Sequence, residues 1–600
     1  MKILLVGGYG VFGSRLARLL VRDGHDLCIA GRDRGAAEAL AREIGARASA
    51  FDRGAAMTTL METLPGHDVV IDAAGPFHVQ GAEPYRLARA AIAAGVHYLD
   101  LSENAAFCQG IAGLDGQAKA AGICVLSGLS SVPALSSAVV RALAGEDAIH
   151  VIETAILPGN RSPRGLSVMH AILAQAGQEV PLWRAGRREY VTGWSAPAAY
   201  MLPGGLRRQG WLIEVPDNRL FPAFFGARTV IFRAGLELWI MRYGLAAFAQ
   251  LRRRVPFAVT RPLVKLFKLA ADALAPFGSG RGGMVVSVVT DRERRVWRLL
   301  AEDGDGPFIP AIAARALLRR TGLPAGAGPA LAMLSLTEIE TAMSDLRVVT
   351  ARETSQDTAL FERVLATAFG TLPPALQDMH RSADRKLWEG RAQVTRGTGL
   401  WPRLIARLFG FPEAGEDVPV RVQKLRSRDG EGEVWLRRFG ARSFRSSFTA
   451  MPNGISERFG PFTFTINLRL RDHGLDYPVT AARLGPLRLP AVLLPAGEAR
   501  ETADGRRCHF DVSIRAPLTH ALIVRYRGWL EPCRGKYPAR DDDLGCLNSD
   551  PSTAVRVCAF RRPGRRMSGS RGRAAWGACA RVPGRWPRHR RARCGGRLPG

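Results

Sequence analysis

A glycine-rich turn near the start of the chain constrains its fold more than any other feature. Residues 8–13 read Gly-Tyr-Gly-Val-Phe-Gly, directly after the apolar run 3–6 and at the start of an amphipathic helical pattern. In this context Gly8 permits a tight turn, Gly10 lets the backbone approach a pyrophosphate, and Gly13 allows close packing of the helix on the strand. The helix N-terminus then faces the phosphates. We therefore expect a dinucleotide to contact Gly8, Tyr9, Gly10, Val11, Phe12 and Gly13.

The first 148 residues alternate short apolar runs with helical patterns, which is typical of βα units in a doubly wound parallel sheet. The runs are apolar throughout, as strands buried on both faces should be. This pattern predicts a Rossmann domain over residues 1–148. The expected strands are 2–6, 26–30, 46–51, 68–72, 97–101 and 123–126, with helices at 10–22, 36–44 and 83–94.

The end of the second expected strand indicates the type of dinucleotide. NAD sites place an Asp or Glu about 20 residues after the glycines, where it binds the ribose hydroxyls. Here Gly31 stands near that position and Arg32 follows, which favours the 2′-phosphate of NADP. Asp33, one residue further on, could instead reach the ribose, so NAD stays open. Asp52, directly after the third expected strand, is a further cofactor candidate.

Ligands of doubly wound sheets lie at the carboxyl ends of the strands. Ala74, Gly75 and Pro76 end the fourth expected strand and should flank the nicotinamide. Asp100 ends the fifth, where it could orient a substrate or relay a proton; capping the following helix is an equally good interpretation. His78 and His380 are interpreted as surface residues, and no metal site is predicted because no cysteine or histidine spacing suits one.

The regular alternation stops after residue 148. Residues 149–355 combine strand and helix patterns and are interpreted as an α+β substrate or dimerisation domain. Within them, the apolar stretch 221–251 is interpreted as a core or dimer helix, with a hydrophobic substrate or a membrane surface as the alternative. Period-two runs dominate residues 372–532, which predicts a mainly β domain.

The final segment, residues 533–600, has a different texture. It contains 17 Lys and Arg against 4 Asp and Glu, with scattered Trp and Cys and no periodicity. We interpret it as a disordered basic tail or as out-of-frame translation of a GC-rich gene, and the second is favoured because Trp and Cys are rare in disordered tails. No functional assignment is based on it.

The net charge of +30 does not by itself indicate nucleic-acid binding, because 77 of the 84 basic residues are Arg and they do not cluster on one element. The scattered cysteines fit a reducing compartment, and the chain is expected to be cytoplasmic. No transmembrane span is expected, because charges interrupt every apolar stretch.

Several strings taken in order resemble the saccharopine dehydrogenase/reductase-like family. They cover about residues 1–350 and include Gly7-Gly8-Tyr9-Gly10-Val11-Phe12-Gly13, Ala30-Gly31-Arg32, Asp72-Ala73-Ala74-Gly75-Pro76-Phe77, Gly95-Val96-His97-Tyr98-Leu99-Asp100-Leu101-Ser102 and Ser131-Val132-Pro133. Residues 372–532 resemble the domain of unknown function 4166 family, through strings such as Trp435-Leu436-Arg437-Arg438-Phe439 and Glu457-Arg458-Phe459-Gly460-Pro461. Saccharopine dehydrogenases themselves lack this second piece, which puts saccharopine as the substrate in doubt.

The resemblance implies an NADP(H)-dependent oxidoreductase that transfers hydride to or from a C=N or C=C bond of a small-molecule substrate. Three alternatives remain open: a non-catalytic NADP-binding sensor or scaffold, a lipid-associated protein resembling enoyl reductases, and a lipid carrier built on residues 372–532. We expect no nucleic-acid partner. A homodimer and a peripheral membrane contact are both compatible with the sequence.

Overall fold

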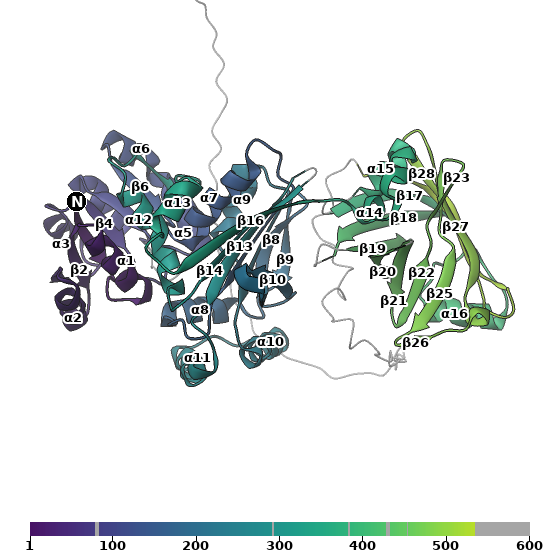
Figure 1. Ribbon diagram of the computed structural model, residues 1–600, viewed down its shortest axis with the longest axis horizontal. Helices are drawn as coiled ribbons and strands as arrows, with labels where there is room; N and C mark the ends of the chain where they lie inside the picture. The colour runs from purple at the N-terminus through teal and green to yellow at the C-terminus, as the bar shows by residue number, and fades with distance from the viewer. Residues whose placement is uncertain (78–82, 291–292, 382–384, 428–431, 453, 534–600) are drawn as a thin grey trace, which may run out of the picture. The chain divides into compact units, whose positions relative to one another are not determined.

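A computed structural model describes residues 1–77, 83–290, 293–381, 385–427, 432–452 and 454–533 (Figure 1). His78 and the segment 534–600, both addressed above, lie outside the described residues. No helix within the described part of the chain is long and apolar enough to cross a membrane.

The N-terminal region is built on a seven-stranded sheet in the order β15-β6-β5-β4-β1-β2-β3, with every pair parallel. The inner strands are buried on both faces because they consist almost wholly of Ile, Leu, Val and Ala. This confirms the predicted doubly wound fold. The strands are β1 (Lys2–Val6), β2 (Asp26–Gly31), β3 (Arg47–Ala50), β4 (Val69–Asp72), β5 (His97–Asp100), β6 (Cys124–Ser127) and β15 (Gly326–Pro329).

Short helices connect these strands. They are α1 (Val11–Arg22), α2 (Arg34–Ile44), α3 (Met57–Thr63), α4 (Arg86–Ala94), α5 (Ala105–Gly110) and α6 (Asp115–Ala120). The seventh strand, β15, comes from far along the chain, so the polypeptide returns to the first sheet after building a second one.

The second sheet has the path β10-β11-β12-β7-β13-β14-β16, with β8 and β9 joined through β12. Its strands are β7 (Val151–Leu157), β8 (Glu179–Arg184), β9 (Arg187–Thr192), β10 (Ala198–Leu202), β11 (Leu206–Leu212), β12 (Thr229–Gly235), β13 (Gly282–Val289), β14 (Glu293–Ala301) and β16 (Val348–Gln356). Its helices are α7 (Ser136–Ala144), α8 (Leu166–Gln175), α9 (Pro216–Phe225), α10 (Trp239–Arg254), α11 (Arg261–Ala273), α12 (Ile309–Leu318) and α13 (Leu336–Ala342). One hydrophobic core joins the two sheets, because residues of β1, α7, β13 and α12 all belong to it.

The interpretation of residues 221–251 as one core or dimer helix is wrong. The segment contains the end of α9, all of β12 and most of α10. Gly226 ends α9 in the left-handed conformation, and the β-branched run Thr229-Val230-Ile231 then enters the sheet beside β7. An apolar run does not by itself distinguish a helix from a buried strand.

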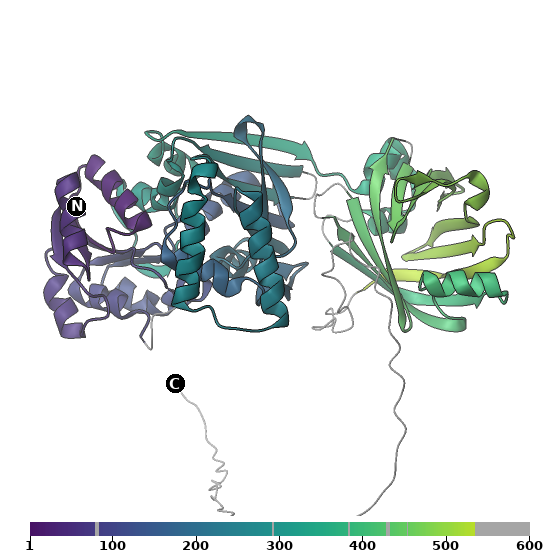
Figure 2. The same ribbon diagram turned by 90° about the horizontal axis from the view of Figure 1, so that it is seen from below.

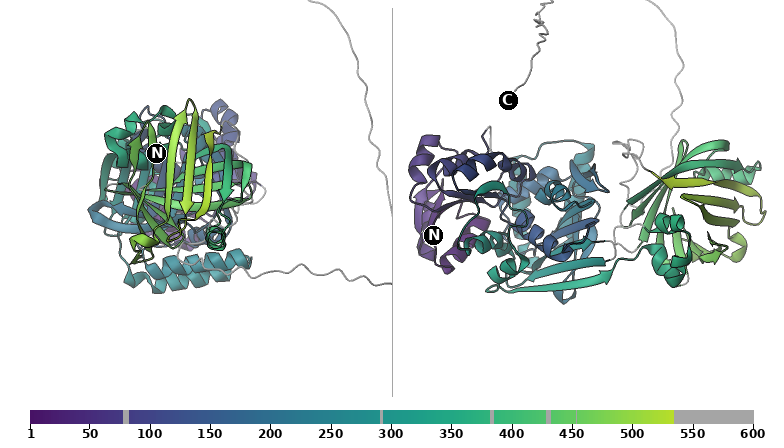
Figure 3. Two further views of the ribbon diagram at one scale, coloured as in Figure 1. Left: turned by 90° about the vertical axis from the view of Figure 1, so that its right-hand side faces the viewer. Right: turned by 90° about the horizontal axis from the view of Figure 1, so that it is seen from above.

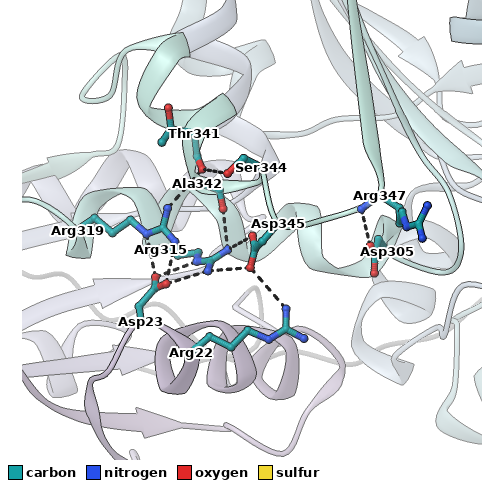
Figure 4. Close-up of polar contacts among 10 residues, drawn as sticks. All are labelled: Arg22, Asp23, Asp305, Arg315, Arg319, Thr341, Ala342, Ser344, Asp345 and Arg347. Atoms are coloured by element: carbon teal, nitrogen blue, oxygen red, sulfur yellow. Dashed lines mark hydrogen bonds and ion pairs between the residues drawn. The ribbon is translucent and has the colours of Figure 1, made fainter.

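An ion-pair network fixes the far end of α1 to α12 (Figure 4). The Arg315 side chain is buried and binds Asp23 through two nitrogens, at 2.8 and 2.9 Å, while Asp345 and the Ala342 carbonyl oxygen accept its other hydrogen bonds. Arg319 also pairs with Asp23, and both arginines lower the pKa of that carboxyl well below its usual range, although burial opposes them. The helix that carries the glycine turn is therefore held at both ends.

The C-terminal region is an antiparallel sheet with the order β23-β24-β27-β28-β29-β17-β18-β19-β20-β21-β22-β25-β26 (Figure 2). Its hydrophobic core is separate from the first and includes Leu360, Phe361 and Phe369, which precede the sheet. The strands are β17 (Arg385–Arg396), β18 (Gly415–Arg426), β19 (Gly432–Phe439), β20 (Arg442–Met451), β21 (Gly454–Phe459), β22 (Phe462–Ile466), β23 (Arg469–Arg471), β24 (Gly474–Asp476), β25 (Val479–Leu484), β26 (Leu487–Arg488), β27 (Ala496–Asp504), β28 (Arg507–Arg515) and β29 (Leu522–Pro532); the helices are α14 (Leu360–Leu365), α15 (Pro374–His380) and α16 (Leu400–Leu408). The predicted mainly β fold is confirmed.

Candidate functional site

The glycine turn lies between β1 and α1 and has no room for a side chain at Gly7 or Gly13. A Cβ atom on Gly13 would stand 2.3 Å from the carbonyl oxygen of Gly7, so only glycine lets α1 approach the turn this closely. Gly7 itself has a φ of +72° and contacts the backbone of Ala74. The turn is closed by the Gly10 amide, which donates to the Gly7 carbonyl at 2.9 Å.

The first turn of α1 is open to an anion. Gly10 is its N-cap residue and supplies no side chain, and the first turn contains no acidic residue. A Cβ atom on Gly10 would meet only the Gly7 carbonyl oxygen, at 3.1 Å, so the space above the turn is otherwise free of protein within van der Waals reach. Amides at an uncapped helix N-terminus form an anion-binding site of the kind that holds a pyrophosphate.

Tyr9 lies over the end of β2. Its ring contacts Gly31, where a Cβ atom would be only 2.4 Å away, and its hydroxyl accepts a hydrogen bond from the Asp33 amide at 3.2 Å. The Asp33 carboxylate caps α2 by accepting from the Ala36 amide at 3.0 Å. Arg32 is exposed beside them. The Asp33 carboxylate, which left NAD binding as an alternative, is thus engaged as the cap of α2, whereas the Arg32 guanidinium is exposed to solvent.

The loop after β3 lies at the same edge of the sheet. Asp52 is exposed, and its carboxylate accepts from the Gly54 amide at 2.9 Å. Arg53 turns inward and pairs with Asp72 at the end of β4, at 3.0 Å. Asp72 also accepts from the Ala74 amide and so holds the segment that follows β4. The sequence did not single out this ion pair.

The segment 74–76 lies where the sequence predicted it, at the carboxyl end of β4 and against the glycine turn. Phe77, which follows it, is buried against Phe107 with ring centroids 5.1 Å apart. Gly75 approaches Ser167, because a Cβ atom on Gly75 would be 3.8 Å from that of Ser167. The segment therefore contacts both the glycine turn and the second sheet's helix α8.

Asp100 is fully buried at the end of β5. One carboxylate oxygen accepts three hydrogen bonds, from the Ser102 amide at 2.9 Å, the Ser127 hydroxyl at 2.9 Å and the Gly128 amide at 2.8 Å. The other oxygen has no hydrogen-bond partner of its own within the described part of the chain. Helix capping, the alternative role, is carried by Asn104 instead.

The pKa of Asp100 is raised to about 7, chiefly because burial disfavours the charged form. The three hydrogen bonds oppose this shift, and the nearby carboxylate of Asp72 adds to it. Tyr98 is buried beside the same carboxyl. A carboxyl that titrates near neutral pH at the carboxyl edge of such a sheet has the properties of a proton donor or acceptor.

Helix α8 provides an opposing wall that sequence reasoning missed. A Cβ atom on Gly165, the N-cap residue of α8, would be 3.5 Å from the Val11 side chain. Ser167, in the first turn of α8, is the residue that approaches Gly75. The only sequence signal was Pro163-Arg164-Gly165 before an apolar run, which indicates a helix start but not its neighbour. The glycine turn, the end of β4 and the N-terminus of α8 are therefore brought together.

The interpretation of His380 as a surface residue is wrong. It is fully buried in the C-terminal region, where its Nε2 contacts Glu501 at 2.7 Å and its Nδ1 receives the Lys424 ammonium at 3.1 Å. Tyr477 donates to the same Glu501 oxygen at 2.5 Å. Because Lys424 donates to Nδ1, this nitrogen is an acceptor and Nε2 carries the proton that Glu501 accepts. His380 is therefore neutral in this network.

The charges of this cluster compensate one another. Burial lowers the pKa of Lys424 to about 8 and that of His380 to about 4. Burial alone would raise the pKa of Glu501, but His380, Lys424 and Tyr477 together lower it to about 2. Lys424 also lies over the Trp435 ring, 3.8 Å from its centroid. Arg437, also in this cluster's neighbourhood, is partly buried and donates to Ser446 at 2.7 Å.

A groove of about 470 Å³ crosses the outward side of β17, β27, β28 and β29. Its side chains pair among themselves: Arg391 binds Asp417 at 2.6 Å, and Arg527 donates to Gln393 at 2.8 Å. No group of His, Cys, Asp and Glu side chains in the described segments could hold a metal ion.

Two family models match the chain. Residues 3–126 match the saccharopine dehydrogenase NADP binding domain, and residues 372–530 match a domain of unknown function, DUF4166. The first match ends within β6 and thus contains the glycine turn, the end of β4 and Asp100. The second spans the strands β17 to β29 almost completely. No curated protein matches the chain.

Two solved structures align with parts of the chain. Saccharopine dehydrogenase (L-Glu forming) from Saccharomyces cerevisiae is 16% identical, with a TM-score of 0.41, and the alignment covers 59% of this chain and 99% of that one. The structure of BdcA in complex with NADPH is 19% identical, with a TM-score of 0.19, and the alignment covers 21% of this chain and 68% of that one.

Proposed function

We propose that the chain is an NADP(H)-dependent oxidoreductase whose cofactor binds along the carboxyl edge of the first sheet. The observation that carries the proposal is the uncapped N-terminus of α1 beside a turn that has no room for a side chain at Gly7 or Gly13, within a segment that matches an NADP binding domain. A Cβ atom on Gly10 would meet the Gly7 carbonyl oxygen at 3.1 Å, and Gly10 therefore keeps the backbone of the turn accessible to a ligand.

In this proposal each contact has a separate role. The backbone of residues 8–13 holds the pyrophosphate, and Arg32 binds the 2′-phosphate through its guanidinium. Asp52 lies at the edge where the adenosine half would rest. Ala74, Gly75 and Pro76 border the nicotinamide, and the missing side chain of Gly75 leaves room for the ring. When bound, the cofactor supplies or accepts a hydride.

Asp100 is the group we assign to proton transfer or substrate orientation. Its buried carboxyl keeps one oxygen without a hydrogen bond, and its pKa near 7 allows both protonation states at neutral pH. Reduction of a C=N or C=C bond requires a proton as well as a hydride, and a group of this kind can hold that proton. We therefore propose a small-molecule substrate with such a bond, placed between β5 and α8.

Titration of the full chain with NADPH and NADH tests the cofactor. Arg32→Ala should weaken NADPH binding about 10- to 100-fold and leave NADH unchanged, because a charge-assisted contact to the 2′-phosphate is worth roughly 1.5–3 kcal/mol. Arg42→Ala, on the exposed side of α2, is the matched control and should have no effect. Equal loss for both nucleotides would remove the 2′-phosphate assignment.

Turnover separates the enzyme from a non-catalytic sensor. NADPH oxidation by the full chain is measured with a panel of imines and enones, and an enzyme should consume NADPH with at least one of them. Asp100→Asn should reduce that rate about 100-fold or more if the carboxyl transfers a proton. Tight NADPH binding without oxidation across the panel would favour the sensor.

A further inference from the structure

Helices α10 and α11 lie side by side below the second sheet (Figures 1 and 2), and the left view of Figure 3 shows helical ribbon in this place beneath the sheets. Phe248 of α10 meets Phe267 of α11, with ring centroids 5.1 Å apart. Their inward positions, among them Leu245, Ala249 and Val264, belong to a core cluster shared with α8. The two helices are thus folded against the body of the protein through one face each.

The opposite face of both helices is apolar too. On α10 the exposed residues Ile240, Tyr243 and Leu251 follow helical spacing, and Trp239 beside them is 67% exposed. On α11 and the turn after it the exposed residues are Leu266, Leu269 and Phe277, with Leu269 at 67% and Phe277 at 76%. We call these seven side chains the α10–α11 face.

A helix with apolar residues on both sides is normally covered on both sides. Large side chains gathered on one exposed surface therefore indicate a partner.

The charges around this face identify the partner's chemistry. Residues 239–277 contain seven Lys and Arg and one acidic residue, Asp272. Arg253, Arg254, Arg261 and Lys265 are exposed, whereas Arg252 is buried and donates to backbone carbonyls at the end of α8. An exposed apolar stripe bordered by basic side chains complements a surface that is apolar inside and anionic at its boundary.

A second copy of the chain fits the same face poorly. In a two-fold dimer the same patch meets itself, which would place like charges opposite one another. Neither helix has the length and apolarity needed to cross a bilayer. The geometry therefore requires helices that lie along a surface.

We propose that the α10–α11 face docks on the surface of a lipid bilayer that carries anionic headgroups. Trp239, Leu269 and Phe277 enter the boundary between headgroups and acyl chains, and the arginines and lysines contact the headgroups. Helix α8, whose N-terminus borders the candidate site, packs directly on α11. The docked face is therefore connected to the candidate site through a single helix.

Co-sedimentation of the full chain with vesicles tests the proposal. One vesicle contains phosphatidylcholine alone, and the other contains equal amounts of phosphatidylcholine and phosphatidylserine. The chain should bind the second far better, and binding should weaken as salt is added. Binding to neither vesicle, or equal binding to both, would overturn the proposal.

Two sets of variants locate the contact. Trp239→Ser with Leu269→Ser removes apolar contact, and Arg253→Glu with Arg254→Glu reverses charge; each should lower vesicle binding at least about tenfold. All four positions are exposed, and unchanged thermal unfolding verifies that the variants fold. The matched charge control, Arg469→Glu with Arg471→Glu on the exposed strand β23, should bind like the wild type.

The short helix α16 provides a second control, because Leu400 and Trp401 are also exposed there. Trp401→Ser should leave vesicle binding unchanged. Loss of binding with this variant but not with the α10–α11 variants would overturn the assignment. A second result would also overturn it: the chain does not bind lipid but forms a dimer, and the double variant Trp239→Ser with Leu269→Ser dissociates that dimer.

Discussion

Two fully or nearly buried carboxyls, Asp100 in the first sheet and Glu501 in the C-terminal region, experience opposite surroundings. Asp100 accepts hydrogen bonds only from neutral donors, and its pKa rises to about 7 because burial dominates. Glu501 is buried as well, but the Lys424 ammonium, His380 and Tyr477 bring its pKa down to about 2. A carboxyl group is therefore able to change protonation near neutral pH in one region and stays ionised there in the other.

The difference indicates which of the two buried groups is built for function. A buried carboxylate that is neutralised by a cation and by hydrogen-bond donors holds these neighbours in one arrangement, and it does not change its protonation near neutral pH. A carboxyl with an unsatisfied oxygen and a raised pKa costs stability, and such a cost is typical of functional sites. We therefore interpret the Asp100 surroundings as a site and the Lys424–His380–Glu501 cluster as part of the framework.

The largest expected effect concerns the framework. Lys424→Met removes the buried cation that attracts the carboxylates of Glu501 and Glu433, which should cost about 3–5 kcal/mol of the free energy of unfolding of the C-terminal region. Urea unfolding measures this loss. NADPH affinity should stay unchanged, and a variant as stable as the wild type would contradict the framework interpretation.

A smaller effect of opposite sign is expected at the site. Asp100→Asn removes a charge that burial disfavours, so at pH 8 the free energy of unfolding should be unchanged or higher by about 1 kcal/mol. Because the folded-state pKa is raised, this gain is full above pH 7 and disappears as the pH falls toward 4. Asp23→Asn is the matched control: its carboxylate is compensated by Arg315 and Arg319, so this variant should lose stability.

The sequence predicted a feature of these two regions where the residues that form the feature are consecutive, and missed it where they are far apart in the chain. The glycine turn and the strands β1 to β6 of the first sheet were predicted because each pattern lies within a few consecutive residues. Strand β15 was not, since Gly326-Ala327-Gly328-Pro329 has no strand propensity and pairs only because the chain returns to β6. The cluster was missed entirely: His380, Lys424 and Glu501 lie up to 121 residues apart and are brought together by the fold alone.

The neighbourhood of Asp100 was predicted in part. Its place at the end of β5 follows from the strand pattern, but its partners Ser127 and Gly128 belong to the next strand and its loop. The sequence therefore left helix capping open as a role, and only the structure assigns that role to Asn104. The wall formed by α8 depends on packing between two sheets, for which a single sequence carries no signal.

The smallest expected effect is the pH dependence of the C-terminal region. The folded-state pKa of His380 is about 4, below its usual 6.5, so this region should lose stability as the pH falls from 6.5 toward 4. His380→Gln can still accept from Lys424 and donate to Glu501 but cannot be protonated, so the acid-side loss should shrink by on the order of 1 kcal/mol. His509→Gln, on the outward side of β28, is the control, and an equal change there would contradict this assignment.

An NADPH titration of the full chain and of two glycine variants tests whether the glycine turn binds the pyrophosphate. Gly10→Ala places a methyl group in the space assigned to the pyrophosphate, whereas Gly116→Ala places one in open space on α6. We expect tight NADPH binding by the wild type and by Gly116→Ala, and at least a tenfold weaker affinity, roughly 1.4 kcal/mol, for Gly10→Ala, with thermal unfolding verifying that this variant is folded. Equal affinity in all three proteins, or no binding by the wild type, would contradict this expectation.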